Sequence, residues 1–263
     1  MGAKAMALSC GGPQVWAKGP EKPDFCAGRV DVWRLRLDDP DTGRSATAML
    51  SPEQNVLSLD EMSRAARFHF ERDRVRFVRC RTTLRRLLSA YLNIPASNVQ
   101  FTYTPRGKPE VAAGQNPNGL RFNVSHSGDL ALIAVGGPED LGIDIEAVRE
   151  DVNTADLAER FFSTRERETL RAFQHSLGLV AFYACWARKE SFLKAMGDGL
   201  AFPLANFSVS VHPDIAPRVE EIGGDASAGL EWSLTDLHAA EGFRSAIAVK
   251  RRGVAIATYH APD

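Results

Sequence analysis

The chain has 263 residues, which is enough for one large domain or for two smaller lobes that each bury a core. Hydrophobic residues make up 44% of it, and no apolar run approaches the roughly 20 residues of a membrane-spanning helix, which excludes a membrane-spanning role. The net charge of -1 excludes a general attraction to polyanions.

The N-terminal region and the cysteines point to a cytoplasmic protein. Residues 1–8 lack the length of a signal-peptide core, and residues 1–29, rich in Gly, Pro and Ala, predict an irregular tail. No C-x-x-C pair is present, which argues against a disulfide framework and a structural zinc site. The cysteines, which we expect to be free thiols, are Cys10, Cys26, Cys80 and Cys185.

The first predicted elements are a strand and a long helical region. Apolar and charged residues alternate over 29–37, which predicts a strand. Ser58 and Glu61 have the spacing of a capping box at a helix start. The helical region is expected to run to Tyr91, because Pro95 disfavours helical geometry just before it.

Short strands are predicted next. They lie near 99–103, 121–125 and 130–135, and the Gly- and Pro-rich segment 104–119 reads as a loop between the first two. Gly136-Gly137-Pro138 then interrupts the chain.

The second half repeats this order loosely. A strand over 141–148 is followed by a second S-x-x-E capping box at Ser163 and a helical stretch to Met196. Further strands are expected near 207–211, 231–234, 244–250 and 254–259. The repetition favours an α+β protein of two similar α/β lobes, an N-terminal lobe over 30–137 and a C-terminal lobe over 138–263.

Arginines are concentrated in one stretch and call for an anionic partner. Three acidic residues accompany them between 61 and 90, where the arginines are Arg64, Arg67, Arg72, Arg74, Arg76, Arg79, Arg81, Arg85 and Arg86. A nucleic-acid-binding module is one alternative, with a steep salt dependence of binding. Against it, Phe68, Phe70 and Phe77 are needed for a core, and no known binding motif is present.

Two carboxylates share one side of the predicted strand over 141–148. Gly142, Asp144 and Glu146 alternate with apolar residues, so they fall on the same face. Carboxylates this close repel one another and are kept for solvent, a cationic partner or a hard cation. A bare D-x-E on an exposed strand face is the simpler alternative.

Glu190 and Lys194 lie one turn apart on a predicted amphipathic helix. An intrahelical ion pair is the default reading of this spacing. Ser125 and His126 lie between two predicted strands and before Gly128, where a loop histidine bonded to backbone is the ordinary alternative. The basic turn Arg106-Gly107-Lys108-Pro109 is most simply solvated surface.

The order of these motifs is more specific than any one of them. G-K-P, F-N-V-S-H-S-G, G-I-D-I-E and W-A-R-K-E-S-F-L-K follow one another between about residue 58 and about residue 211. In this combination the chain resembles the Sfp-type 4′-phosphopantetheinyl transferase family. The resemblance implies a pseudo-twofold pair of lobes with the active site, and coenzyme A, in the cleft between them.

The resemblance also implies which residues make the site. Mg²⁺ would be held by Asp144, Glu146 and Glu190, together with oxygens of the coenzyme A pyrophosphate. The adenosine and its 3′-phosphate would be surrounded by Arg76, Lys108, Ser125 and His126, with Gly107 and Pro109 shaping the adenine pocket. Lys194 would lie near the pyrophosphate. Glu61 stands where some family members carry a lysine, so Arg64 is expected to make the phosphate contact of the first helix alone.

The implied reaction is of the holo-[acyl-carrier-protein] synthase type. A serine hydroxyl of an acyl or peptidyl carrier protein attacks the β-phosphorus of coenzyme A and displaces 3′,5′-ADP, with Glu190 as base, directly or through water, or Glu146 in its place. We expect a monomer that binds neither nucleic acid nor membrane. A Mg²⁺-dependent phosphohydrolase with the same carboxylates is a second alternative, and it would turn over coenzyme A with water alone.

Overall fold

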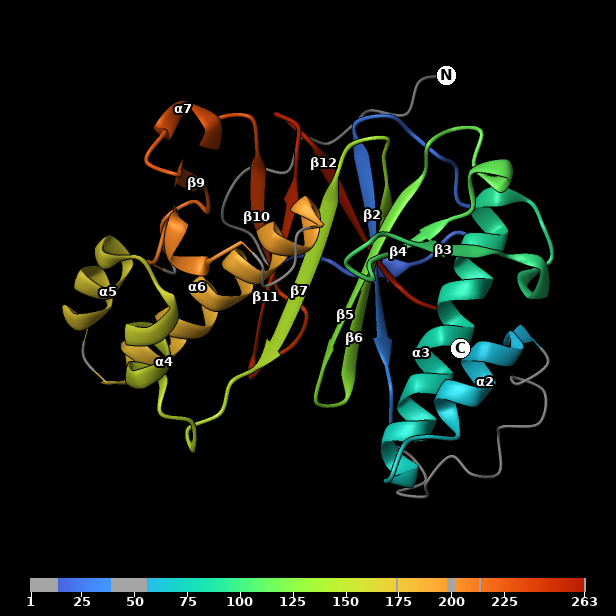
Figure 1. Cartoon of the computed structure of the whole chain (residues 1–263), viewed down its shortest axis with the longest axis horizontal. Helices are drawn as coiled ribbons and strands as arrows, with labels where there is room; N and C mark the ends of the chain where they lie inside the picture. The colour runs from blue at the N-terminus through green and yellow to red at the C-terminus, as the bar shows by residue number, and fades with distance from the viewer. Residues whose placement is uncertain (1–13, 39–55, 174, 198–201, 213, 263) are drawn as a thin grey trace.

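Two β-sheets pack face to face between two long helices (Figure 1). The computed structural model describes residues 14–38, 56–173, 175–197, 202–212 and 214–262. The helices are α2 (Leu59–Ala65), α3 (Glu71–Leu92), α4 (Thr154–Phe161), α5 (Thr164–Arg171), α6 (His175–Met196) and α7 (Ala226–Gly229).

The strands form two main sheets and two short pairs. The first sheet has the order β1-β12-β2-β6-β5, and its strands are β1 (Ala17–Lys18), β12 (Ala255–His260), β2 (Arg29–Arg36), β6 (Leu130–Gly136) and β5 (Arg121–Ser127). The second has the order β10-β11-β7, with β10 (Ser233–Leu237), β11 (Phe243–Val249) and β7 (Leu141–Ala147). The short pairs join β3 (Phe101–Tyr103) to β4 (Pro109–Val111) and β8 (Phe207–Val209) to β9 (Val219–Ile222).

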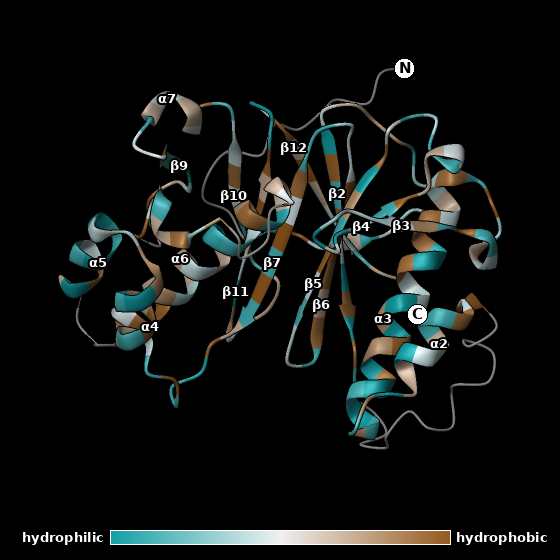
Figure 2. Cartoon of the chain, viewed as in Figure 1, coloured by the Kyte–Doolittle hydropathy of each residue, from teal (hydrophilic) through white to brown (hydrophobic). Residues whose placement is uncertain are grey.

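The core is arranged in layers. One hydrophobic cluster lies between the sheets and takes Val32 and Leu132 from the first and Ile143 and Ile145 from the second. A second cluster joins α3 to the outer face of the first sheet, and a third joins α6 to the second sheet and β8. Figure 2 shows this distribution, with hydrophobic residues along β6 and hydrophilic ones on the peripheral α5. The two long helices, each of 22 residues, thus cover opposite outer faces.

The two capping boxes of the sequence are formed, and both have a second role. At α2 the backbone N–H of Ser58 donates to Glu61 at 2.9 Å, and Glu61 also accepts from Arg85 of α3, 24 residues later, at 2.6 Å. At α5 the N–H of Ser163 donates to Glu166 at 2.9 Å. Glu166 in turn accepts from Lys189 of α6, 23 residues later, at 2.7 Å.

This repeated arrangement ties a short helix to the long helix of the same half. In each case one carboxylate satisfies a free donor at the helix start and pairs with a buried basic residue of the long helix. The expectation of an α+β fold built from two lobes of similar plan is therefore confirmed. Glu61 is 3% exposed and faces α3, so it has no part in the phosphate contacts expected of this helix.

Several expected elements differ in detail. The helical region of the first half is two helices, because the chain turns at 66–70 to let Glu61 of α2 meet Arg85 of α3. The stretch expected to run to Met196 is likewise divided, into α5 and α6. The segment 104–119, expected to be a loop, contains β4, and β9 lies where no strand was expected.

The two ends of the chain join the first sheet. Within the tail, expected to be irregular, Ala17–Lys18 forms β1, which pairs with β12, and residues 1–13 lie outside the described part. β12 pairs in parallel with β2, so the last strand of the sequence crosses to the sheet of the first half. The boundary between the lobes at 137/138 stays a prediction. β12 lies after it in the sequence but belongs to the same sheet as β2, which lies before it.

The cysteines and the helices of the described residues bear on the disulfide framework and the membrane-spanning role that the sequence argues against. Cys26, Cys80 and Cys185 are free thiols, and Cys10 lies outside the described residues. Among the helices of the described part, none has both the length and the apolar character needed to cross a bilayer.

Candidate active site

Side chains of β5 bridge to the backbone of β7, and we call this contact between the edges of the two main sheets the seam. Oδ1 of Asn123 accepts from the backbone N–H of Ile143 at 2.9 Å, and Oγ of Ser127 accepts from that of Ala147 at 3.0 Å. Between them, Oγ of Ser125 accepts from the N–H of Ile145 at 3.3 Å. Each contact joins residues 20 positions apart, so β5 and β7 run in parallel. The edge strands of two separate sheets are thus joined by side chains where a backbone ladder is absent.

Gly142 brings α6 close to β7. A Cβ built on Gly142 would lie 2.2 Å from the backbone N of Ala195 and 2.2 Å from the carbonyl O of Ser191, so no larger residue fits without moving the helix. This close approach sets the helix against the carboxylates of β7. It explains why the glycine precedes Asp144 by two residues on the same face of the strand.

Asp144 is the centre of a buried polar cluster. Its Oδ1 accepts from Oγ of Ser125 at 2.9 Å and from Nζ of Lys194 at 2.6 Å, and the same ammonium donates to Ser125 at 2.9 Å. Its Oδ2 is buried and has no hydrogen-bond partner. Beside it, Oε2 of Glu146 accepts from Oγ of Ser127 at 3.2 Å.

The carboxylates repel one another. Burial raises the pKa of Asp144, although the Lys194 ammonium opposes the shift. Burial, followed by the charge of Asp144, raises the pKa of Glu146 to about 7 and also raises the pKa of Glu190. Burial and mutual repulsion thus outweigh the one ammonium that acts on all three carboxylates, that of Lys194, and such a carboxylate set suits a hard cation.

The simpler alternatives for these residues do not hold. Asp144 is 2% exposed, so the D-x-E pair is not an exposed strand face. Lys194 pairs with Asp144, and no Glu190–Lys194 ion pair is formed among the described residues. In the described part of the chain, no group of three or more His, Cys, Asp or Glu side chains is already gathered as a metal site.

A basic cavity lies on the other side of β5. It has a volume of about 640 Å³, and its lining includes Arg64, Arg76, Arg81, Pro109 and His126. Burial lowers the pKa of His126, and the charges of Lys194, Arg76 and Arg64 lower it further. Ser127 lines this cavity and also donates to Glu146, so the cavity adjoins the carboxylate cluster.

The structure places the remaining predicted residues as follows. The ammonium of Lys108 donates to the carbonyl oxygens of Lys194 at 2.6 Å and Leu141 at 3.1 Å, at the end of α6. Gly107 has a φ of +82° in the turn between β3 and β4, a conformation that favours glycine. Ser125 joins the carboxylate cluster and does not line the cavity. Asn123, Ser127 and Gly142 had no role in the sequence reasoning, although all three stand in the quoted motifs.

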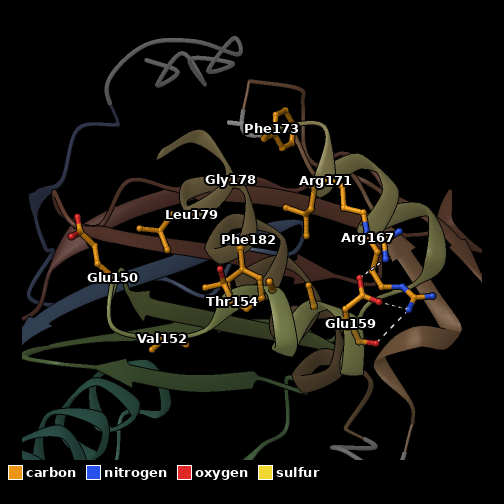
Figure 3. A pocket seen from close by; sticks show the side chains of 13 residues that line it. Glu150, Val152, Thr154, Glu159, Arg167, Arg171, Phe173, Gly178, Leu179 and Phe182 are labelled. Carbon is orange, nitrogen blue, oxygen red and sulfur yellow. Dashed lines mark hydrogen bonds and ion pairs between the residues drawn. The ribbon is translucent and has the colours of Figure 1, made fainter. Parts of the chain in front are cut away.

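A second cavity, of about 320 Å³, lies in the other half of the chain (Figure 3). Leu179 and Phe182 of α6 line it, and at its rim Glu159 of α4 lies between Arg167 and Arg171 of α5. None of the residues predicted for the site lines this cavity, so the chemistry is assigned to the first one.

The arginine-rich stretch is partly engaged within the chain. Arg85 is 2% exposed and bonded to Glu61, and Arg74 pairs with Glu71. Arg64 and Arg76 line the cavity, and Arg76 is paired there with Asp38. The stretch therefore contributes cations to the lining of one cavity, and its internal ion pairs keep it from being a continuous basic surface.

The chain is similar to known proteins of one family. A model of the 4′-phosphopantetheinyl transferase superfamily matches residues 140–249, and a model of the N-terminal part of 4′-phosphopantetheinyl transferases matches residues 45–137. The 4′-phosphopantetheinyl transferase HetI of a Nostoc species is 35% identical over 234 residues, which cover 89% of this chain and 93% of HetI.

Two further similarities involve more distant proteins. The 4′-phosphopantetheinyl transferase Sfp of Bacillus subtilis is 32% identical over 176 residues, which cover 65% of this chain and 76% of Sfp. The crystal structure of Thermotoga maritima holo-[acyl-carrier-protein] synthase overlaps 43% of this chain and 64% of its own, at 22% identity and a TM-score of 0.34. The extent of the match to HetI, together with both family models, establishes that this chain belongs to the 4′-phosphopantetheinyl transferase superfamily.

Proposed function

We propose that this chain transfers the 4′-phosphopantetheine arm of coenzyme A to a serine of an acyl or peptidyl carrier protein, converting the apo carrier into its holo form. The observation that carries the proposal is the adjacency of two chemically opposite sites. A basic cavity suited to a phosphorylated nucleoside meets a buried carboxylate cluster at Ser127. We propose that the enzyme is a monomer, because one chain supplies both halves of the site, and that it works in the cytoplasm.

The basic cavity would hold the nucleotide end of coenzyme A. Arg76 and His126 are assigned to the 3′-phosphate and Arg64 to a further phosphate contact, since guanidinium groups form paired hydrogen bonds with phosphate oxygens. Pro109 lines the same cavity and would border the adenine. Gly107 allows the turn that leads to Pro109, and Lys108 would act by fixing this turn to the end of α6.

The carboxylate cluster is assigned to magnesium. Asp144 Oδ2 is buried without a partner, and the pKa of Glu146 is raised by burial and by Asp144, so the residues present fit an oxygen-liganded cation. Asp144, Glu146 and Glu190 would hold Mg²⁺. When bound, the ion would neutralise charge on the pyrophosphate of coenzyme A.

The reaction exchanges one bond for another at the β-phosphorus. The serine oxygen of the carrier forms a bond to that phosphorus, the bond to the leaving phosphate oxygen breaks, and 3′,5′-ADP departs with the electron pair. Lys194 would stabilise charge on the pyrophosphate oxygens. The serine proton would pass to Glu190, directly or through water, or to Glu146 in its place.

Mass spectrometry of a panel of apo carrier proteins, incubated with the enzyme, coenzyme A and Mg²⁺, tests the function. We expect at least one carrier to gain one phosphopantetheine group. Asp144→Asn and Glu190→Gln should abolish the gain while remaining folded, and exposed Glu231→Gln serves as the control. Asparagine is chosen because Asp144 is buried, and alanine there would leave a cavity. Near-parental loading by either site variant would contradict the assignment.

The phosphate assignment has its own test. Arg76→Ala and His126→Ala should raise the KM for coenzyme A more than they lower kcat, because the two residues act on binding. With dephospho-coenzyme A, which lacks the 3′-phosphate, most of the difference from the parent should disappear. Equal losses with both substrates would show that these residues do not contact that phosphate.

A further inference from the structure

A carboxylate of the chain itself engages Arg76, one of the cationic residues of the basic cavity. Nε of Arg76 donates to Oδ1 of Asp38 at 2.7 Å, and its Nη2 donates to Oδ2 of the same carboxylate. Asp38 follows the last residue of β2 by two positions, whereas Arg76 lies in the second turn of α3. The contact therefore joins the segment after β2 to α3, and both contribute residues to the cavity lining, Leu37 and Arg76.

The geometry of this pair matches that of a bound phosphate. A planar guanidinium offers two parallel N–H groups to two oxygens, whether these belong to a carboxylate or to a phosphate. Asp38 takes up both groups at once. A phosphate can therefore gain the paired contact with Arg76 only after the Asp38 carboxylate has turned away.

The position of Asp38 is fixed by its neighbour. Leu37 is 1% exposed, and its backbone N–H donates to the carbonyl oxygen of Asp129 at 2.7 Å. Asp38 is held beside α3 by this anchor, while its own side chain is 43% exposed and can rotate into water. Displacement is thus possible without unfolding any element.

The charges around Asp38 favour its ionised form. The hydrogen bond from Arg76 lowers the pKa of Asp38, and the charges of Arg72 and Arg79 lower it further. The carboxylate therefore competes as an anion at neutral pH. Its competitor is a phosphomonoester, the group on the 3′ position of coenzyme A and of 3′,5′-ADP.

We propose that Asp38 sets the affinity of the enzyme for the 3′-phosphate by competing with it for Arg76. The proposal rests on the proposed function, in which Arg76 binds that phosphate. Asp38 reduces the affinity that the contact between Arg76 and the 3′-phosphate provides, both for coenzyme A and for 3′,5′-ADP. Weaker binding of 3′,5′-ADP then favours release of this product after each transfer.

Calorimetric binding of 3′,5′-ADP and of ADP, which lacks the 3′-phosphate, to the full-length protein tests the proposal. An ion pair this exposed predicts that Asp38→Asn binds 3′,5′-ADP about twofold to fivefold more tightly than the parent. Its affinity for ADP should be unchanged. The KM for coenzyme A should fall by a similar factor, with no rise in kcat.

Asp129→Asn is the matched control. It removes the same charge close to Arg76, but Asp129 pairs with Arg36 at 3.4 Å and has no direct contact with Arg76. An equal gain in both variants would show a general charge effect and overturn the role of Asp38. Asp38→Ser offers a second variant without the carboxylate, and thermal unfolding of each variant verifies its fold.

The outcomes separate the two proposals. If both Asp38 variants bind 3′,5′-ADP no more tightly than the parent, in an enzyme that loads carrier protein, only the competition is overturned. Weaker binding in particular would mean that Asp38 orients Arg76 toward the phosphate. A parent that neither binds 3′,5′-ADP nor loads any carrier overturns the proposed function and, with it, this inference.

Discussion

The ammonium of Lys194 lies 2.6 Å from Oδ1 of Asp144, and this carboxylate is 2% exposed. The pair links α6 to β7 at the position where the two halves of the chain meet. Because removal of the lysine would leave the buried carboxylate without a cationic partner, we expect its replacement to destabilise the fold.

Lys194→Met should lower the free energy of unfolding by about 1–3 kcal/mol at neutral pH, less than for a fully buried pair because Lys194 is partly exposed. The pKa of Asp144, already raised, would rise further, so stability should recover as pH falls and Asp144 takes up a proton. Urea unfolding in the presence of a metal chelator measures the change. Lys194→Met with Asp144→Asn should recover most of the loss, and a double variant no more stable than the single one would contradict this account.

Ser127→Ala should affect both stability and catalysis. The variant loses the acceptor for the Ala147 N–H and the donor to Glu146, so we expect a loss of about 1 kcal/mol in unfolding free energy. It should also lower kcat, because Glu146 loses the contact that orients it. Urea unfolding and steady-state kinetics measure the two effects. Ser127→Thr keeps the hydroxyl and should retain more of both, while exposed Ser97→Ala is the control. Parental kcat in Ser127→Ala would rule out the orienting role.

Binding of coenzyme A should be linked to a proton on His126. Burial and the neighbouring cations lower the pKa of His126, so the free enzyme holds this imidazole neutral at physiological pH. A bound phosphate beside it favours the charged form and raises its pKa. Affinity should therefore fall as pH rises between about pH 6 and pH 8. Calorimetry in buffers of different ionisation enthalpy should detect proton uptake, and His126→Asn should reduce it. Equal proton uptake in parent and variant would place the linkage elsewhere.

Glu146 should make the stability of the metal-free protein depend on pH. Its pKa in the folded state is about 7, against an ordinary value of 4.5, so the folded state binds a proton that the unfolded state has released. The contribution of this proton to stability is fully present below pH 4.5, the ordinary pKa of a glutamate, and is lost as pH rises through about 7. We expect a loss of about 1–2 kcal/mol, reduced by partial exposure of the side chain.

Urea unfolding with a chelator, and again with Mg²⁺, tests this dependence. Glu146→Gln should remove most of the slope, and Mg²⁺ should stabilise the parent more at about pH 8 than at about pH 5, where the carboxylates are more protonated. An identical slope in Glu146→Gln, or no effect of Mg²⁺ at either pH, would count against the proposed ligand set.

The parts of the fold that could be predicted have local causes. Both capping boxes depend on residues three positions apart, and the strand carrying Asp144 and Glu146 depends on simple alternation, so the sequence alone predicts them. The end of α3 is equally local, since Asn93 adopts the left-handed conformation that ends the helix before Pro95.

What could not be predicted has non-local causes. The break between α2 and α3 carries no glycine or proline, and its reason, the pairing of Glu61 with Arg85, joins residues 24 positions apart. The crossing of β12 to β2 depends on contacts between opposite ends of the chain. The roles of Gly142 and Lys108 depend on the approach of α6, which no pattern within either segment contains.

The side-chain seam between β5 and β7 makes this chain comparable to a dimer whose two subunits have been fused. A symmetric dimer would carry the same residues twice. One set of side chains would then have to form both the basic cavity and the carboxylate cluster. Fusion removes that constraint, since each half can change without its twin. Here the carboxylates of the cluster come from one half and the arginines of the cavity from the other, so one site of mixed character stands where a symmetric dimer would have two identical sites.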